Sequence, residues 1–327
     1  MQAFLDDLGV ICPADRFVAL LSNAYHEAES AVYDEVHREL DDAAEAWTRC
    51  LESLARTLPA SLRVLDIGAG TGFASLQVLR VLGPRIERLV CLDPSAAMLA
   101  KARLRLDGRG VTPRFVVGDL AAVRPRGGQF DLVVTNSVLH HVPDVAGFLA
   151  GVHGLLSAGG VYVAGHEPSR DHFEHAELRR WGALYRRWRR LRQFTSLTAY
   201  RRRWSRSPVR PSVVEATNAA LLTRGVISRP LPPPAIRRLI DIHVPSPESP
   251  APGWAQAGLT RRDVLGGGVS ACELAFETSY SHIKDARARM GAGWRAVDGW
   301  LSRRLPMHGS NFVIAVRHPG PSAATRL

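Results

Sequence analysis

The strongest constraint on the fold is a regular alternation of short apolar runs with helix-length segments, which begins at Arg63. The runs read RVLDI, RLVCLD, PRFVVGD, FDLVVTN and GVYVAGHE. Runs separated in this way are typical of parallel strands joined by right-handed crossovers, because each parallel pair needs a connection long enough to hold a helix. We expect five parallel strands, and two further strands at 272–280 and 311–318 that complete the sheet.

Helix signals lie between the predicted strands. Pro94 and Ser95 open the segment SAAMLAKARLRL, and Pro143 and Asp144 open VAGFLAGVHGLL. Serine and aspartate at such positions cap the free N–H groups of a first helical turn. The glycines at 159 and 160 are expected to end the second of these helices.

Four regions follow from this pattern. The chain has 327 residues and is 46% hydrophobic, which is enough for one sizeable core and a smaller second unit. We expect a helical N-terminal cap at 1–60, a core at 61–166 and completion of the core sheet at 257–327. Residues 167–256 hold an arginine-rich helix and a proline-rich stretch, and are expected to form a loop-rich lid or substrate insertion.

The charge of the chain says little about its partners. The net charge is +11, but the only lysines are Lys101 and Lys284, so nearly all of the positive charge is arginine. Much alanine, glycine and proline accompany it, as a GC-rich coding sequence would produce. The charge is therefore a weak argument for a nucleic-acid or membrane partner.

Cysteines and the N-terminal sequence exclude other classes. The four cysteines are scattered without C-x-x-C spacing, which predicts neither a disulfide framework nor a metal site. The first residues lack the pattern of a signal peptide, and no run has the roughly 18 apolar residues of a spanning helix. We expect a cytoplasmic protein without membrane insertion.

A glycine-rich turn follows the first predicted strand. The stretch VLDIGAGTGFAS holds Gly68, Gly70 and Gly72, and Asp66 lies just before them. Such a turn brings backbone N–H groups and a helix N-terminus close to a ligand. The spacing is G-x-G-x-G, and Phe73 stands where a dinucleotide-binding turn has its third glycine. Asp66 could accept hydrogen bonds from an ammonium group, which nicotinamide cofactors do not offer at this point.

At these residues the chain resembles the class I S-adenosylmethionine-dependent methyltransferases. VLDIGAGTG, RLVCLDPS, FVVGDLAAV, FDLVVTNSVLHHVPD and LLSAGGVYVAGHEP are similar to successive motifs of that family, over about residues 60–167. The resemblance implies an α/β, Rossmann-like seven-stranded sheet whose last strand is antiparallel and inserted beside the fifth. It also implies S-adenosylmethionine as the cofactor.

The resemblance assigns roles to individual residues. Asp93 would accept from both ribose hydroxyls, although an acid at this place also suits NAD. Asp119 would accept from the adenine amino group, Leu120 would offer a backbone N–H, and Asn136 would face the methionine end. The predicted cofactor-binding residues are Asp66, Gly68, Ala69, Gly70, Gly72, Asp93, Pro94, Met98, Asp119, Leu120 and Asn136. The three acids could instead be helix or turn caps, and Met98 could be core.

Candidate general bases follow the fourth and fifth strands. They are His140, His141, His166 and Glu167, with Asp171 and His172 just beyond. A base helps only when the attacking atom carries a proton, because the enzyme must chiefly align the acceptor in line with the C–S bond. One of the paired histidines could equally serve packing or capping. Tyr25, His26 and Tyr33 could close over the cofactor or substrate, or belong to the core.

The stretch ELRRWGALYRRWRRLRQF predicts a basic amphipathic helix with an apolar stripe of Trp181, Leu184, Tyr185, Trp188 and Leu191. It could be a lid over a small substrate, an RNA-binding face or a membrane-surface helix. We prefer the lid, because no RNA-binding module is evident and Thr135-Asn136-Ser137-Val138 lacks the tetrapeptide of amino-methylating nucleic-acid enzymes.

The expected function is methyl transfer to a small organic acceptor, in natural-product biosynthesis and without a metal. We expect no stable nucleic-acid complex. The alternatives are an RNA methyltransferase, a membrane-surface lipid or quinone methyltransferase, and a binding module without activity. The sequence leaves the oligomeric state open, a homodimer included.

Overall fold

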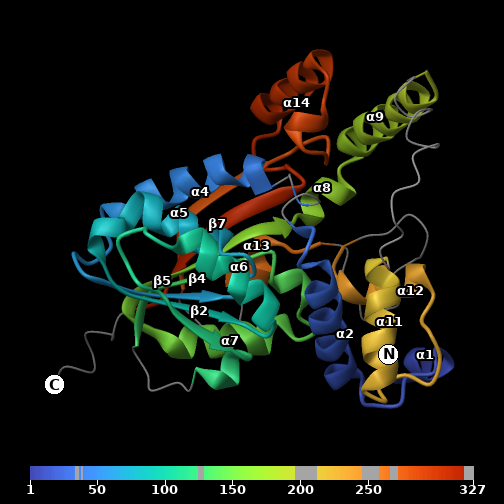
Figure 1. Cartoon of the computed structure of the whole chain (residues 1–327). Coiled ribbons are helices and arrows are strands. Elements are labelled where there is room, and N and C mark those ends of the chain that lie inside the picture. The colour runs from blue at the N-terminus through green and yellow to red at the C-terminus, as the bar shows by residue number, and fades with distance from the viewer. Residues whose placement is uncertain are drawn as a thin grey trace.

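The computed structural model describes residues 1–33, 37, 40–123, 129–195, 212–244, 258–265 and 272–319. Within these ranges the strands are β1 (Leu62–Ile67), β2 (Ile86–Asp93), β3 (Arg114–Val117), β4 (Phe130–Asn136), β5 (Leu156–Pro168), β6 (Glu273–Tyr280) and β7 (Asn311–Arg317). They form one seven-stranded sheet in the order β3-β2-β1-β4-β5-β7-β6. Figure 1 shows the sheet between its flanking helices.

The order and directions of the strands confirm the sheet that the resemblance implies. β1 pairs in parallel with β2 and β4, and β4 pairs in parallel with β5. β7 is antiparallel to both β5 and β6, so it is inserted between them. β5 begins at Leu156, before the glycines that were expected to separate it from the preceding helix. Because β1, β2, β4 and β5 run parallel to one another, their carboxyl ends meet at one edge of the sheet.

Helices cover both faces of the sheet, so the central strands are buried on both sides. On one face, α4 (Leu40–Ala55), α5 (Phe73–Leu82) and α6 (Ala96–Leu106) pack with Val64 and Leu132 in one apolar cluster. On the other face, α7 (Val145–Leu155) and α13 (Arg261–Leu265) pack with Leu65 and Val133. Side chains of Ser95 and Asp144 cap α6 and α7 as predicted, each accepting a backbone N–H.

The N-terminal region divides between two packing units. α4 belongs to the main core, where the fully buried Trp47 lies against β5. In contrast, α1 (Gln2–Asp7) and α2 (Ala14–Glu29) pack with α11 (Val213–Thr223) and α12 (Pro233–Ile240) in a separate apolar cluster. Figure 1 shows α1, α2, α11 and α12 as a group beside the sheet. Two segments about 200 residues apart thus form one unit.

The region after β5 is more helical than the expected loop-rich insertion. It holds α8 (Arg170–Glu174), α9 (Ala176–Thr195), α11 and α12. Residues 196–211 and 245–257, with much of the proline-rich stretch, lie outside the described residues. None of the described helices is both long enough and apolar enough to span a bilayer.

The arginine-rich helix α9 packs against α14 (Ala292–Arg304), and the two stand together at one end of the molecule (Figure 1). Its buried face is formed by Leu178 and Tyr185, which are 1% and 2% exposed, with Trp181 and Trp188 partly buried beside them. Leu184 and Leu191 are 51% and 68% exposed. The expected apolar stripe is therefore wrong in these two leucines, and Leu178 takes their place.

Candidate active site

The glycine turn connects β1 to α5. Gly68, Gly70 and Gly72 have φ angles of 66°, 53° and 86°, a conformation that glycine adopts without strain. A Cβ on Gly68 would lie 2.5 Å from Val138 Cγ2, so this glycine lets the turn approach the loop after β4. A Cβ on Gly70 would meet only the Gly68 carbonyl oxygen, at 3.9 Å, so the space beside Gly70 is open. Ala69, between Gly68 and Gly70 in the turn, is buried in the apolar core.

Asp66 is fully buried at the carboxyl end of β1. Its Oδ2 accepts hydrogen bonds from the Ser75 hydroxyl at 2.6 Å and from the Ser75 backbone N–H at 3.0 Å. Its Oδ1 has no hydrogen-bond partner among the described residues. Burial raises the pKa of Asp66 to about 7, against the hydrogen bonds from Ser75. A buried oxygen without a donor is what an incoming ammonium group would satisfy.

Asp93 lies at the end of β2 and stabilises the glycine turn. Its Oδ2 accepts from the Gly70 N–H and its Oδ1 from the Ser95 N–H, both at 2.8 Å. Burial raises the pKa of this carboxyl, while the two backbone N–H groups and His26 act in the opposite direction. Each carboxylate oxygen has more than one lone pair, so both can still accept from a ligand hydroxyl.

The other predicted cofactor residues surround these two acids. Asp119 is exposed and accepts the Ala121 N–H, which caps the turn that contains Leu120. Met98 is buried in α6 and Pro94 is exposed at the end of β2. Asn136 ends β4 and accepts from the Trp47 indole N–H at 2.9 Å. These residues fit the cofactor that the resemblance implies, because they combine an orphaned buried oxygen, an open turn and polar strand ends.

Glu167 is fully buried and holds the loop after β4 through hydrogen bonds. Its Oε1 accepts the N–H groups of Val138 and Leu139 at 2.8 and 2.9 Å. Its Oε2 accepts the backbone N–H of His140 at 3.2 Å and the His140 ring Nδ1–H at 2.8 Å. Burial acts to raise the pKa of Glu167, but His140 and the backbone donors lower it below its usual range. Both oxygens of Glu167 are enclosed by the loop after β4, which favours a role in orienting His140 over direct removal of a proton from the acceptor; its part in catalysis stays a prediction.

His140 is oriented by this carboxylate. With Nδ1 donating to Glu167, the neutral ring carries its lone pair on Nε2, which lies 3.9 Å from Asp241 Oδ1. Burial acts to lower the pKa of His140, yet Glu167 raises it above the usual value. A buried carboxylate that fixes a histidine tautomer is the arrangement that general bases use.

His141 lies in a cluster of imidazole rings beside His140. Its Nδ1–H donates to the Ile240 carbonyl at 2.8 Å, and its ring centroid lies 4.1 Å from that of His140 and 5.1 Å from that of His26. Burial and the neighbouring His140 and His26 lower the pKa of His141 well below its usual value. The cluster thus joins α2, the loop after β4 and the end of α12.

Four further residues in this cluster, Asp241, His243, Glu29 and His37, were not identified from the sequence. Asp241 lies 3.6 Å from His141 Nδ1, and His243 Nε2–H donates to the Val142 carbonyl at 3.0 Å. The buried Glu29 lies 3.6 Å from His26 and 3.3 Å from His37. His140, His141 and Asp241 bring potential metal-ligand atoms within 4.8 Å of one another, but both Nδ1 atoms already donate to protein oxygens.

His166 contacts β6. It has a φ of 56° where the β5–β7 register shifts, and its Nδ1 lies 2.6 Å from the Tyr280 hydroxyl on β6. His172 is buried and donates to the His308 carbonyl, and burial lowers its pKa to about 4. Asp171 is exposed on α8. Of the predicted bases, the structure therefore brings together only His140, His141 and Glu167.

Two aromatic residues, Tyr25 on α2 and Tyr33 shortly after that helix, lie beside the same rings. Tyr25 and Tyr33 both make edge contacts with His26, at centroid distances of 5.7 and 6.4 Å. Burial and the neighbouring Glu29 raise the pKa of Tyr25 to about 12. His26 also acts to lower the pKa of Asp93, so it links these aromatic rings to the predicted cofactor-binding residues.

Comparison with known proteins bears on the same part of the chain. A family model described as a methyltransferase domain matches residues 65–162. A trans-aconitate 2-methyltransferase of Deinococcus radiodurans is 35% identical over 147 residues, which are 44% of this chain and 52% of that protein. A ubiquinone biosynthesis O-methyltransferase of Ruegeria pomeroyi is 34% identical over 104 residues, which are 32% of this chain and 40% of that protein.

These matches span only about half of the relatives' length or less. Among solved structures, an S-adenosylmethionine-dependent methyltransferase from Mesorhizobium loti aligns with a TM-score of 0.41 and 18% identity, over 85% of this chain and 99% of that one.

Proposed function

We propose that this chain is a class I S-adenosylmethionine-dependent methyltransferase that transfers the sulfonium methyl group to a small organic acceptor in natural-product biosynthesis. The observation that carries the proposal is the placement of the histidine cluster directly beside the glycine turn. Val138, two residues before His140, limits the space at Gly68, and His26 acts on both Asp93 and His141.

The cofactor would be held at the carboxyl edge of the sheet. Asp66 Oδ1 would accept from the ammonium group of its methionine part, and Asp93 from the ribose hydroxyls. Asp119 and the Leu120 N–H would bind the adenine. When bound, the cofactor supplies an electrophilic methyl group, and the protein must align the acceptor and exclude water.

His140 is the proposed base for an acceptor that carries a proton. Its Nε2 would take the proton from the attacking oxygen or nitrogen, while Glu167 holds the ring and stabilises its protonated form. A positioned base of this kind typically contributes about 10²- to 10⁴-fold to the rate. α2 and the end of α12 would enclose the acceptor, because His26 and Ile240 both contact His141.

A small acceptor is favoured over RNA by the packing of α9. Its aromatic rings are engaged with α14: Tyr185 lies 5.1 Å and Trp188 5.8 Å from the Trp294 ring centroid. The Tyr185 hydroxyl donates to Asp285, and Arg189 pairs with the same carboxylate at 2.9 Å. Rings packed in this way against α14 have less surface left for stacking on bases, which sequence-tolerant RNA binding requires. The lid role of α9 remains a prediction.

The proposal is tested by incubating the protein with methyl-labelled cofactor and three acceptor sets: small phenols, small polycarboxylates and bulk RNA. We expect label transfer to a small acceptor, and weak RNA binding that fades between about 50 and 200 mM salt. Label on RNA, with binding that survives such salt, would favour the RNA alternative. Cofactor binding without transfer to any member of a broad acceptor panel would favour a binding module.

A further inference from the structure

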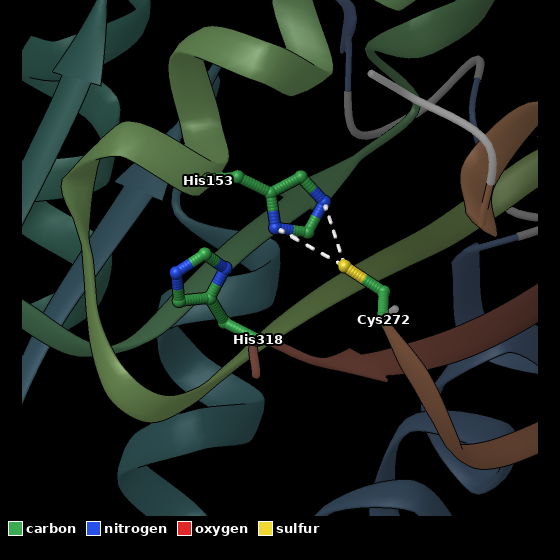
Figure 2. Close-up of side chains that lie close together, drawn as sticks. All are labelled: His153, Cys272 and His318. Carbon is green, nitrogen blue, oxygen red and sulfur yellow. Dashed lines mark hydrogen bonds between the residues drawn. The ribbon is translucent and has the colours of Figure 1, made fainter. Parts of the chain in front are cut away.

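Three potential metal ligands meet at the edge of the sheet opposite to the glycine turn. His153 lies near the end of α7, Cys272 immediately precedes β6, and His318 follows β7. Because β7 runs antiparallel to β5 and β6, its end lies beside their beginnings. Figure 2 shows the three side chains facing one another. No motif spacing reveals this group, because its members come from parts of the chain more than 40 residues apart.

The distances are close to those of a metal site. The Cys272 sulfur lies 3.8 Å from both ring nitrogens of His153, as the dashed lines in Figure 2 mark. One ligand atom from each of the three residues lies within 4.8 Å of the other two. Zinc bonds of about 2.3 Å to sulfur and about 2.0 Å to nitrogen put tetrahedral ligand atoms about 3.5 Å apart. A small rotation of the His153 ring would turn one nitrogen toward the shared centre.

The surroundings also suit a bound cation. His153 is 2% exposed, and its only polar contacts among the described residues are with this cysteine. The Nδ1 of His318 is buried without a hydrogen-bond partner in the described part of the chain. The two imidazole rings are stacked at 29° with their centroids 5.6 Å apart. Buried polar nitrogens without donors or acceptors are costly, and a metal would satisfy them.

We propose that His153, Cys272 and His318 bind a zinc ion. One sulfur and two imidazole nitrogens match the ligand preference of zinc, whereas calcium and magnesium prefer oxygen. Three protein ligands leave a fourth position for water, since Cys272 and His318 are only half-buried. On binding, the Cys272 thiol releases its proton to solvent and the sulfur coordinates as thiolate, while both histidines bind as neutral rings.

The proposed ion would fasten three chain segments. His318 is already anchored by its backbone N–H, which donates to the Gly160 carbonyl at 2.8 Å near the start of β5. Zinc would add links to α7 and to the first residue before β6. The site lies away from the cofactor edge, so its role would be to stabilise the fold and not to take part in methyl transfer.

The test uses the purified full chain, freed of metal with a chelator and then titrated with cobalt as a spectroscopic substitute for zinc. We expect one equivalent to bind with a thiolate-to-cobalt charge-transfer band. Cys272→Ser should abolish this band, and His318→Gln should weaken zinc binding by at least about 10-fold. Cys12→Ser is the matched control, because Cys12 is also half-buried but packs near α1 and α2. It should leave the band unchanged.

A second readout is the melting temperature with and without zinc. We expect zinc to raise it in the wild type and in Cys12→Ser but not in Cys272→Ser, because an ion that binds only the folded state stabilises it. Absence of the charge-transfer band at one equivalent of cobalt, or a band that persists in Cys272→Ser, would overturn the proposal. Neither readout depends on methyl transfer, so the proposed function can fail separately.

Discussion

At the scale of single residues, the cofactor side depends on a carboxyl whose charge is costly. Asp66 is fully buried, and only one of its oxygens has donors among the described residues. The ionised form therefore needs a partner, which the ammonium group of the cofactor would supply. This links cofactor affinity to the protonation of Asp66.

We accordingly expect cofactor affinity to fall at low pH. Burial raises the pKa of Asp66 to about 7 in the free protein. Below that pH the carboxyl is protonated and must release a proton when the cofactor binds, so the Kd should rise by up to about 10-fold per pH unit. Above it the Kd should level off. Calorimetric titration with S-adenosylhomocysteine at a series of pH values measures this.

Asp66→Asn is the control for that titration, because the amide oxygen can still accept from Ser75. The variant should bind weakly and without this pH dependence. An unchanged slope in Asp66→Asn would assign the titration to another group.

A second residue-scale prediction separates His140 from Glu167. His140→Ala should lower kcat by about 10²-fold or more with an acceptor that carries a proton, while cofactor affinity changes little. Since Glu167 raises the pKa of His140 against the effect of burial, Glu167→Gln should shift the acid limb of the pH–rate profile to lower pH. His172→Gln, a change at a buried histidine outside the cluster, should keep the wild-type profile.

An unchanged pH–rate profile in both His140→Ala and Glu167→Gln would contradict these roles. The candidates left would then be His141 and His166, or alignment of the acceptor without a base.

At the scale of elements, local periodicity predicts the type of a segment, whereas long-range packing determines which other elements it contacts. The strand runs and the caps at Ser95 and Asp144 were predictable, because they follow from local pattern and side-chain chemistry. The pairing of α2 with α11 and α12 was not, because nothing local joins residues about 200 positions apart. The contact of Trp47 with Asn136 was missed for the same reason. Burial of Glu167 also required the loop after β4 to be seen folded around it.

The helix α9 gives a direct test of the element-scale packing. Leu178 is buried against α14, so Leu178→Ala should lower the free energy of unfolding by about 2–5 kcal/mol. Leu184→Ala changes an exposed leucine of the same helix and should alter it by no more than about 0.5 kcal/mol. Urea denaturation of both variants measures the difference. Equal losses of unfolding free energy in the two variants would mean that Leu184 is buried, as the sequence predicts.

At the scale of the whole molecule, the sheet separates two kinds of chemistry. Its carboxyl edge gathers Asp66, Asp93 and the histidine cluster, as parallel α/β sheets do for their ligands. Its amino edge gathers the proposed zinc ligands. The order of the strands came from the resemblance and not from periodicity, since alternating runs fit several parallel sheets. The helical unit formed by α1, α2, α11 and α12 lies beside the carboxyl edge, where its His26 reaches the histidine cluster.

The central claim is that the glycine turn and the acids beside it bind S-adenosylmethionine, and calorimetry tests it most directly. The wild type should bind S-adenosylmethionine and S-adenosylhomocysteine, and NAD only weakly. Asp93→Ala should weaken binding by about 1.5–3 kcal/mol, the contribution of hydrogen bonds to a charged group, whereas Asp107→Ala on the exposed end of α6 should not. Tight binding of NAD without binding of either sulfur-containing nucleoside would contradict the account.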